Sequence, residues 1–338
     1  MLKLGVLDQS PIRAGGTPAQ AIAETVRLAQ EAEALGYSRY WLAEHHGTDG
    51  FAGSSPEIMI ARVAGATSTI RVGSGGVMLS HYSPLKVAEN FKLLENMFPG
   101  RIDLGIGRAP GSDGLTAAAL AYGNQVGIEY FPTKIADLSA FLTDSPPTTE
   151  AFARVRATPR APEIPELWLL GSSDQSAAYA AHFGIAFSFA HFIAPEAAVP
   201  VLAYYRDQFK PSGILAAPQA SAGVYVICAD TAEEAERLAA SRDYWRLKLG
   251  QGQHLPYPPP EEALAYPYTP QERAQIEHNK ANRITGTPAM VRAKLEELAD
   301  QLGVDELVIL TITYDFGARL HSYRLLAEAF GLDRRVAA

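Results

Sequence analysis

The 338-residue sequence has a single cysteine, Cys228. One thiol excludes an intrachain disulfide and any metal site built from several cysteines. No apolar run reaches 18 residues, the length that a membrane-spanning helix requires. The opening stretch MLKLGVLDQS has no apolar signal-peptide core and already has the pattern of a strand. We therefore expect a soluble, cytoplasmic protein.

Basic side chains are also in the minority. The sequence has 29 Lys and Arg against 37 Asp and Glu, which gives a formal net charge of −8. This balance disfavours nucleic acid and anionic membranes as partners. Apolar residues make up 47% of the chain, so a large core can be buried. The length suits one α/β barrel with insertions, and we predict a single domain over residues 1–338.

Short aliphatic runs alternate with longer helical patterns along the chain. The runs predict strands at 2–11, 38–46, 70–79, 101–111, 166–173, 185–192, 221–229 and 305–315. The helical patterns cover 17–36, 54–68, 83–100, 174–184, 195–209, 231–250 and 318–330. Such alternation is typical of a parallel sheet with both faces covered. Eight units fit a closed (β/α)8 TIM barrel better than an open doubly wound sheet.

Two segments interrupt this repeat, at about 110–165 before the fifth strand and at about 250–285 before the eighth. The second segment is rich in Pro and Tyr. It fits equally well a surface loop and a lid over the barrel mouth, because long loops in compact domains are often functional. We carry the lid forward as a hypothesis for residues 250–284.

The predicted strands turn polar or glycine-rich at their carboxyl ends. The residues at these ends are Asp8, Glu44, Gly75, Gly107, Ser172 and His191. In a parallel barrel the carboxyl ends of the strands meet on one face, and that face holds the active site. We therefore expect these residues to surround a functional rim.

The stretch WLAEHHG, at 41–47, ends the second strand with Glu44, His45 and His46. Alternation along a strand places Glu44 and His46 on one side and His45 on the other. The sequence shows no matched set of further ligands, so we predict no metal site. The cluster could cap the barrel structurally, and its position at a strand end favours an acid–base or cofactor-contacting role.

Two other strand ends have features of an anion site. Arg108 follows the fourth strand, and a guanidinium matches phosphate oxygens bidentately. Gly171, Ser172 and Ser173 follow the fifth strand and precede a helix, whose first N–H groups attract anions. Simple helix capping by a serine is the alternative. GIGRAPG at 105–111 has the wrong spacing for a dinucleotide-binding loop.

Several motifs together resemble the bacterial luciferase-like flavin monooxygenases, in their non-luminescent, single-chain branch. They are WLAEHH at 41–46, the long stretch from RVGSGGVML to GRAPG at 71–111, LLGSS at 169–173 and TGTP at 285–288. The resemblance covers nearly the whole chain and is weakest in the first interrupting segment.

The resemblance implies a TIM barrel that binds FMN at its rim. Reduced FMN, supplied by a separate reductase, would activate O2 to oxidise a small, apolar organic substrate. His45 corresponds to the catalytic imidazole and Glu44 to its neighbour, which would orient His45 or raise its pKa. Gly75 and Gly76 correspond to the pair beneath the flavin ring, often joined by a cis peptide. The phosphate-binding positions correspond to Arg108, Gly171, Ser172, Ser173 and Ser176.

The sequence departs from the light-emitting members at Gly107, where they have a cysteine, and at Ser172, where they have an acidic residue. Light emission and a long-chain aldehyde substrate are therefore not implied. Two alternatives stay open: a non-catalytic flavin-binding protein, and an oxidoreductase that transfers hydride with the deazaflavin F420. The resemblance and the apolar helical segments 57–66 and 90–98 together predict a homodimer.

Overall fold

The computed structural model describes residues 2–109, 111–122, 129–161 and 163–332. The strands are β1 (Lys3–Asp8), β2 (Arg39–Leu42), β3 (Arg71–Ser74), β4 (Val77–Met78), β5 (Ile102–Gly107), β6 (Glu166–Gly171), β7 (Ala186–Ala190), β8 (Ala220–Cys228), β9 (Ile284–Gly286) and β10 (Glu306–Leu310). The α-helices are α1 (Pro18–Leu35), α2 (Pro56–Ala64), α3 (Pro84–Met97), α4 (Gly114–Ala121), α5 (Phe131–Leu142), α6 (Asp174–Phe183), α7 (Ala198–Asp207), α8 (Ala232–Gly250), α9 (Pro260–Ala265), α10 (Pro270–Asn279), α11 (Pro288–Leu302) and α12 (Phe316–Phe330).

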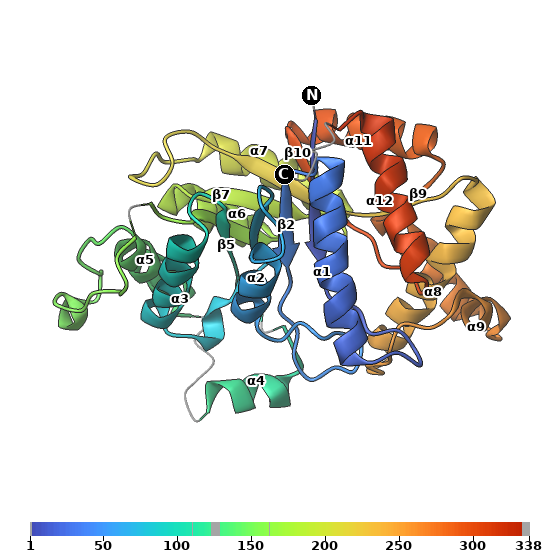
Figure 1. The fold of residues 1–338 in the computed structure, drawn as a ribbon, viewed down its shortest axis with the longest axis horizontal. Coiled ribbons are helices and arrows are strands. Elements are labelled where there is room, and N and C mark those ends of the chain that lie inside the picture. The colour runs from blue at the N-terminus through green and yellow to red at the C-terminus, as the bar shows by residue number, and fades with distance from the viewer. Residues whose placement is uncertain (1, 110, 123–128, 162, 333–338) are drawn as a thin grey trace.

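The strands close into a parallel barrel. Neighbours pair in the order β10, β1, β2, β3, β5, β6, β7, β8, and β8 pairs back onto β10. The major helices surround this barrel (Figure 1). The predicted (β/α)8 TIM barrel is confirmed. Two short strands lie outside the ring, since β4 adds to the end of β5 and β9 to the end of β8.

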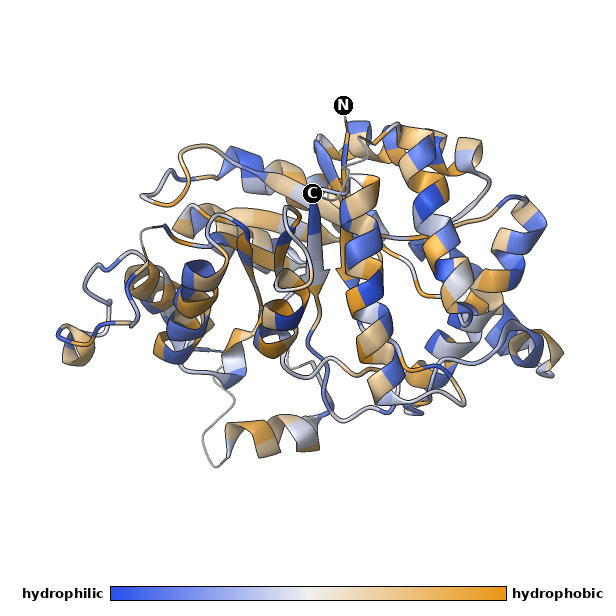
Figure 2. Cartoon of the chain, in the orientation of Figure 1, coloured by the Kyte–Doolittle hydropathy of each residue, from blue (hydrophilic) through white to orange (hydrophobic). Residues whose placement is uncertain are grey.

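Two apolar layers hold the barrel together. The interior is filled by side chains that include Leu7, Trp41, Trp168, Tyr225 and Leu310. A larger layer lies between the outer faces of the strands and the inner faces of the helices, and Figure 2 shows apolar and polar residues on different sides of several helices. Helix length is set by local signals. For example, α1 begins at a capping box and ends at a left-handed glycine.

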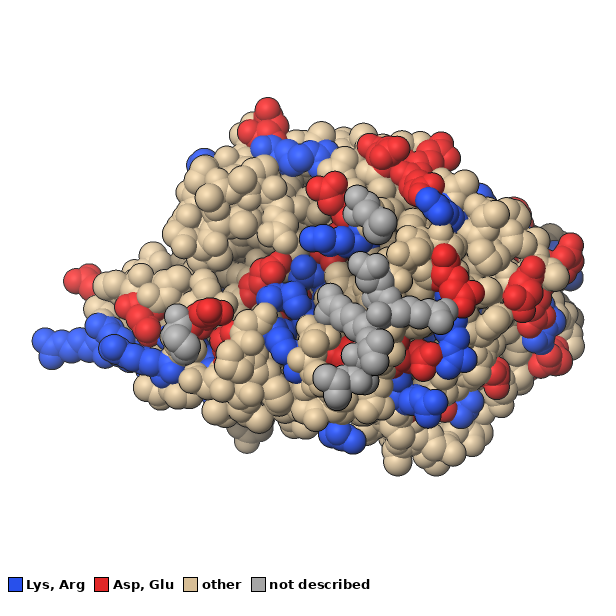
Figure 3. Space-filling model, turned by 45° about the horizontal axis from the view of Figure 1, so that its top comes forward, with Lys and Arg blue, Asp and Glu red and all other residues tan. Residues whose placement is uncertain are grey.

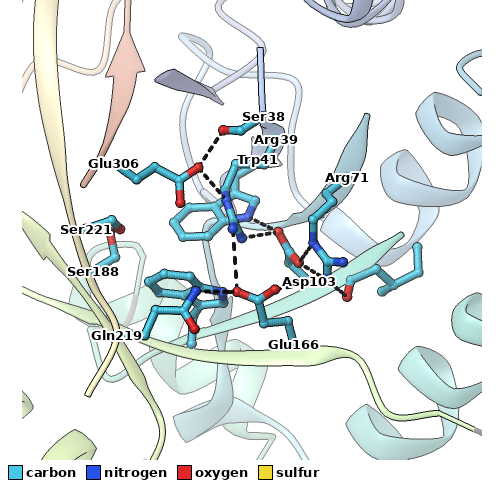
Figure 4. A network of polar contacts seen from close by, with 12 residues as sticks. Ser38, Arg39, Trp41, Arg71, Asp103, Glu166, Ser188, Gln219, Ser221 and Glu306 are labelled. Atoms are coloured by element: carbon cyan, nitrogen blue, oxygen red, sulfur yellow. Dashed lines mark hydrogen bonds and ion pairs between the residues drawn. The ribbon is translucent and has the colours of Figure 1, made fainter. Parts of the chain in front are cut away.

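A polar network closes the barrel at the amino ends of its strands (Figure 4). Arg39 donates to Asp103 at 2.7 Å and to Glu306 at 2.9 Å, and it pairs with Glu166 at 3.5 Å. Trp41 Nε1 also donates to Asp103, at 2.9 Å. Burial opposes the charge of Arg39, but the three carboxylates outweigh it and raise the pKa of Arg39 above its ordinary value. The buried charges at this end of the barrel therefore have partners, and we call Arg39, Asp103, Glu166 and Glu306 the charged floor.

Asp8 does not belong to the rim as the sequence predicted. It is fully buried, and its carboxylate accepts from Tyr40 Oη at 2.5 Å, from Ser10 N at 2.8 Å and from Arg319 Nη2 at 2.8 Å. Burial opposes ionisation, yet Arg319 and these hydrogen bonds hold the pKa of Asp8 below its ordinary value. Leu7 points into the barrel, so alternation turns Asp8 outward, toward α1 and α12.

The two interrupting segments contain more helix than their composition suggested. The first includes α4 and α5, the second includes α9, α10 and β9, and α11 follows. In Figure 1 α4 lies at the bottom, at the end of the molecule toward which β1 runs. Its residues are largely apolar (Figure 2), and Leu115 on it is 83% exposed. Among the described residues, no helix combines the length and the apolar content that a membrane span needs.

Charged side chains of both signs are interspersed over the face shown in Figure 3. Ion pairs among the described residues include Arg324 with Glu31 at 2.6 Å and Arg292 with Glu296 at 2.8 Å. Because opposite charges alternate, their fields largely cancel at a distance.

Candidate active site

A cavity of about 340 Å³ lies at the carboxyl ends of the barrel strands. It is bordered by the segment after β2, by α8, by the chain just after α8 and by the end of β10. Its described lining residues are Gln9, His45, His46, Thr48, Phe51, Gly111, Ser112, Phe192, Ile193, Tyr225, Arg242, Trp245, Arg246, Leu249, His254, Tyr257, Leu310 and Ile312. The walls are therefore mainly aromatic and aliphatic, with a few basic groups, as in a small-molecule site.

His45 lies in the wall of this cavity. Its ring packs against Phe51 with centroids 4.6 Å apart, and Phe51 contacts Trp245 at 5.4 Å. Nδ1 of His45 is buried and has no hydrogen-bond partner among the described residues. Burial, with a smaller contribution from His46, lowers the pKa of His45 to about 4. The imidazole is therefore neutral at neutral pH and has a free ring nitrogen.

The carboxylate of Glu44 binds other groups than the His45 imidazole, so the predicted orienting role is wrong. Its carboxylate, fully buried, binds His46 Nε2 at 2.8 Å and accepts from Tyr82 Oη at 2.6 Å and from Met78 N at 2.9 Å. The alternation that pairs Glu44 with His46 is confirmed by these contacts. The expected rise in the pKa of His45 is also wrong, because burial dominates. In the described part of the chain, no three His, Cys, Asp or Glu side chains could hold a metal ion together.

Gly75 and Gly76 follow β3 and are joined by a cis peptide bond. Gly75 borders a second cavity of about 50 Å³ inside the barrel mouth, and Phe192 lines both cavities. A Cβ on Gly76 would lie 2.8 Å from the carbonyl oxygen of Gly105 on β5. Close strand packing therefore requires glycine at position 76, whereas Gly75 exposes its backbone to the cavity.

The predicted phosphate residues come together at the start of α6. Arg108 follows β5, Gly171 ends β6, and these strands are neighbours. Arg108 Nη1 donates to the side chain of Gln175 on α6 and forms no ion pair with any described carboxylate. Ser173 caps α6 by accepting from Ser176 N at 3.3 Å.

The remaining members of this group complete the turn. The hydroxyls of Ser173 and Ser176 are 3.1 Å apart, and Ser172 is half-buried between β6 and α6. A Cβ on Gly171 would collide with the hydroxyl of Ser176. None of the predicted phosphate residues lines the larger cavity. The predicted site therefore divides into the cavity with His45, the small cavity beside Gly75 and the start of α6 beside Arg108.

Sequence reasoning missed one whole wall of the larger cavity. This wall consists of Arg242, Trp245, Arg246 and Leu249 on α8, followed by His254 and Tyr257. A signal was present, because positions 242, 245, 246 and 249 recur at the spacing of one helical face. Tyr257 anchors the segment after α8, donating to Ile312 O at 3.2 Å.

Comparisons with known proteins agree with this geometry. A family model described as luciferase-like monooxygenase matches residues 2–306. Bacillus subtilis YceB is 46% identical, over 98% of this chain and 100% of its own. The N-acetyl-S-alkylcysteine monooxygenase of Bacillus subtilis is 39% identical, over 97% of this chain and 98% of its own. The crystal structure of apo-MsnO8 is 40% identical with a TM-score of 0.91, covering 99% of this chain and 100% of that one. Because these matches span nearly the whole chain, the protein belongs to the luciferase-like monooxygenase family of oxidoreductases.

Proposed function

We propose that the protein is an FMN-dependent monooxygenase that uses reduced flavin and O2 to oxidise a small organic substrate with an apolar part. The observation that carries the proposal is the imidazole of His45 in an aromatic cavity, with a buried Nδ1 that has no hydrogen-bond partner among the described residues. That cavity adjoins the mouth bordered by Gly75 through the shared wall residue Phe192. A substrate and a flat cofactor ring can thus meet beside one proton-handling group.

The residues present fit FMN. Gly75 presents backbone rather than a side chain to the barrel mouth, which leaves room for a planar ring. Arg108 lacks a carboxylate partner among the described residues and stands at the start of α6 with Ser173 and Ser176, where a phosphate would be stabilised. When bound in the reduced form, FMN supplies the electrons that activate O2. A separate reductase would provide that reduced flavin.

Residues of the protein itself transfer protons and keep water out of the cavity. His45 can accept or donate a proton at Nδ1, which has no hydrogen-bond partner among the described residues. Phe51, Trp245 and Tyr257 exclude water from the same space, which protects a reactive intermediate from side reactions. Glu44 supports the site from below through Tyr82 and His46.

The test is oxygen consumption by the protein with reduced FMN and a panel of small organic substrates. N-acetyl-S-alkylcysteines belong in the panel because a relative 39% identical is named for them. We expect substrate-dependent oxygen uptake above flavin autoxidation, and incorporation of one atom from labelled O2 into the product.

The same assay separates the alternatives. Hydride transfer with F420 and no reaction with reduced FMN would replace the proposal with the F420-dependent reading. Tight flavin binding without any substrate-dependent oxygen uptake would favour a non-catalytic flavin-binding protein.

A further inference from the structure

The described lining of the larger cavity contains basic residues but no acidic ones. The basic residues are two arginines and three histidines. The protein as a whole has a net charge of −8, so basic groups gather here against the general composition. An apolar substrate alone would not need these basic groups.

Arg242 is almost completely buried, with 2% of its surface exposed. Its guanidinium lies 4.3 Å above the ring of Tyr225, and its polar contacts within the described residues are long, with Asp243 at 3.4 Å and with Asn282 O at 3.3 Å. Asp243 lies closer to Arg283, at 3.0 Å. The carboxylate beside Arg242 is therefore shared with a second guanidinium.

Arg246 lies one helical turn further along α8. It makes no hydrogen bond and no ion pair with any described residue, although part of it is buried. Burial, and next the charge of Arg242, lower the pKa of Arg246 below its ordinary value, but a guanidinium stays charged at neutral pH. Of these two neighbouring cations, Arg242 has only the shared carboxylate of Asp243, and Arg246 has no carboxylate partner among the described residues.

We propose that Arg242 and Arg246 bind the carboxylate of an anionic substrate, a refinement that rests on the proposed function. Guanidinium groups pair bidentately with carboxylates, and burial strengthens the contact. The apolar remainder of the substrate lies along Phe51, Trp245 and Ile312, toward His45. Neutral analogues bind weakly, because they leave Arg246 without a counterion and Arg242 with only the shared Asp243.

The flavin phosphate is the other anion that could occupy this place. The geometry favours the substrate, because Arg108, Ser173 and Ser176 form a separate cationic turn at α6 that does not line this cavity. The experiment below separates the two anions.

Binding is measured by calorimetry on the flavin-free protein, with the series from phenylacetate to 6-phenylhexanoate and the corresponding neutral amides. We expect at least one carboxylate to bind about ten- to hundredfold more tightly than its amide, the range of a charge-assisted contact. Arg246→Gln should abolish that preference, and Arg246→Lys should restore part of it. Arg237→Gln is the matched control, because Arg237 lies on α8 but pairs with Glu234 and Glu261.

Three results would overturn the proposal. The first is equal binding of acids and amides throughout the series, and the second is a preference for the acid that survives in Arg246→Gln. A third is a loss of FMN preference over riboflavin in Arg246→Gln, which would assign the arginines to the cofactor phosphate. Because no flavin or oxygen is present in the calorimetry, a failed oxygenase assay would leave this result standing. Carboxylate binding would likewise not rescue a failed oxygenase assay.

Discussion

At the scale of single residues, the side chains after β2 differ in their contacts and therefore in their roles. Strand alternation predicted that Glu44 and His46 share a side, and their 2.8 Å contact confirms it. Alternation does not predict how deeply a side chain is buried. The low pKa of His45 and the lack of a partner for its Nδ1 among the described residues could therefore not be predicted from adjacent residues in the sequence. Those properties depend on Phe51 and Trp245, the second of which lies 200 positions away in the sequence.

His45→Ala should retain FMN affinity within a few-fold and lose substrate oxygenation by about 10²–10⁴, the usual contribution of a positioned acid–base group. His46→Ala should lose less, because His46 binds Glu44 rather than facing the reaction. Stopped-flow mixing of the reduced FMN complex with O2 measures both variants. A His45→Ala enzyme that oxidises substrate at the native rate would make this imidazole purely structural.

The same histidine predicts a pH effect on stability. Its pKa is about 4 in the folded protein and 6.5 as the reference value, so between these values the unfolded state binds the extra proton. Stability is thus lost as pH falls from 6.5 toward 4, by on the order of 3 kcal/mol at most. Urea unfolding of His45→Gln should show a smaller loss than native protein. His278→Gln, at an exposed histidine, should behave like native protein.

Arg108→Ala should lose most of the preference for FMN over riboflavin while remaining folded. The contact between a guanidinium and a phosphate contributes roughly 1.5–3 kcal/mol, which is about a ten- to hundredfold change in affinity. Flavin fluorescence titration of both ligands measures it, with the exposed Arg292→Ala on α11 as the control. Equal binding of the two flavins by the native protein would show that the phosphate lies elsewhere.

At the scale of elements, the eight barrel strands could be predicted because each is an aliphatic run followed by a turn. Helices in the interrupting segments were harder. α9 and α10 each begin with proline, as does α11 just after the second segment. Proline is typical of loops but also suits the first turn of a helix. α10 also has no buried residue, so its sequence lacks the recurring apolar residues from which an amphipathic helix is predicted. α5 does show one, with Phe131, Ile135, Leu138 and Leu142 buried.

The lid hypothesis for residues 250–284 now applies to its outer part. Tyr257 is buried and its backbone pairs with Ile12, so the inner part is fixed, whereas α10 buries nothing. Amide hydrogen exchange should be faster in residues 260–279 than in α11, and should slow when FMN and substrate bind. Identical exchange with and without ligands would reduce this segment to static surface structure.

At the scale of the whole molecule, the homodimer stays a prediction with a defined surface. Ile58 on α2 is 71% exposed, and Leu93 and Met97 on α3 are 51% and 52% exposed; these two helices pack together. Light scattering should give twice the chain mass of 36.4 kDa. Leu93→Glu should shift the protein toward monomer, and Leu264→Glu, on α9, should not. A native protein of single-chain mass at micromolar concentration would contradict the prediction.

The charged floor around Arg39 has a consequence for how this enzyme could be altered. The groups that hold the barrel shut lie at the amino ends of the strands, and the groups assigned to chemistry lie at the opposite ends. Tolerance to substitution should therefore be polarised along the barrel axis. A library that randomises the walls around Trp245 and Ile312 should yield mostly folded variants with new selectivity, whereas one that randomises positions around Asp103 should yield mostly insoluble protein.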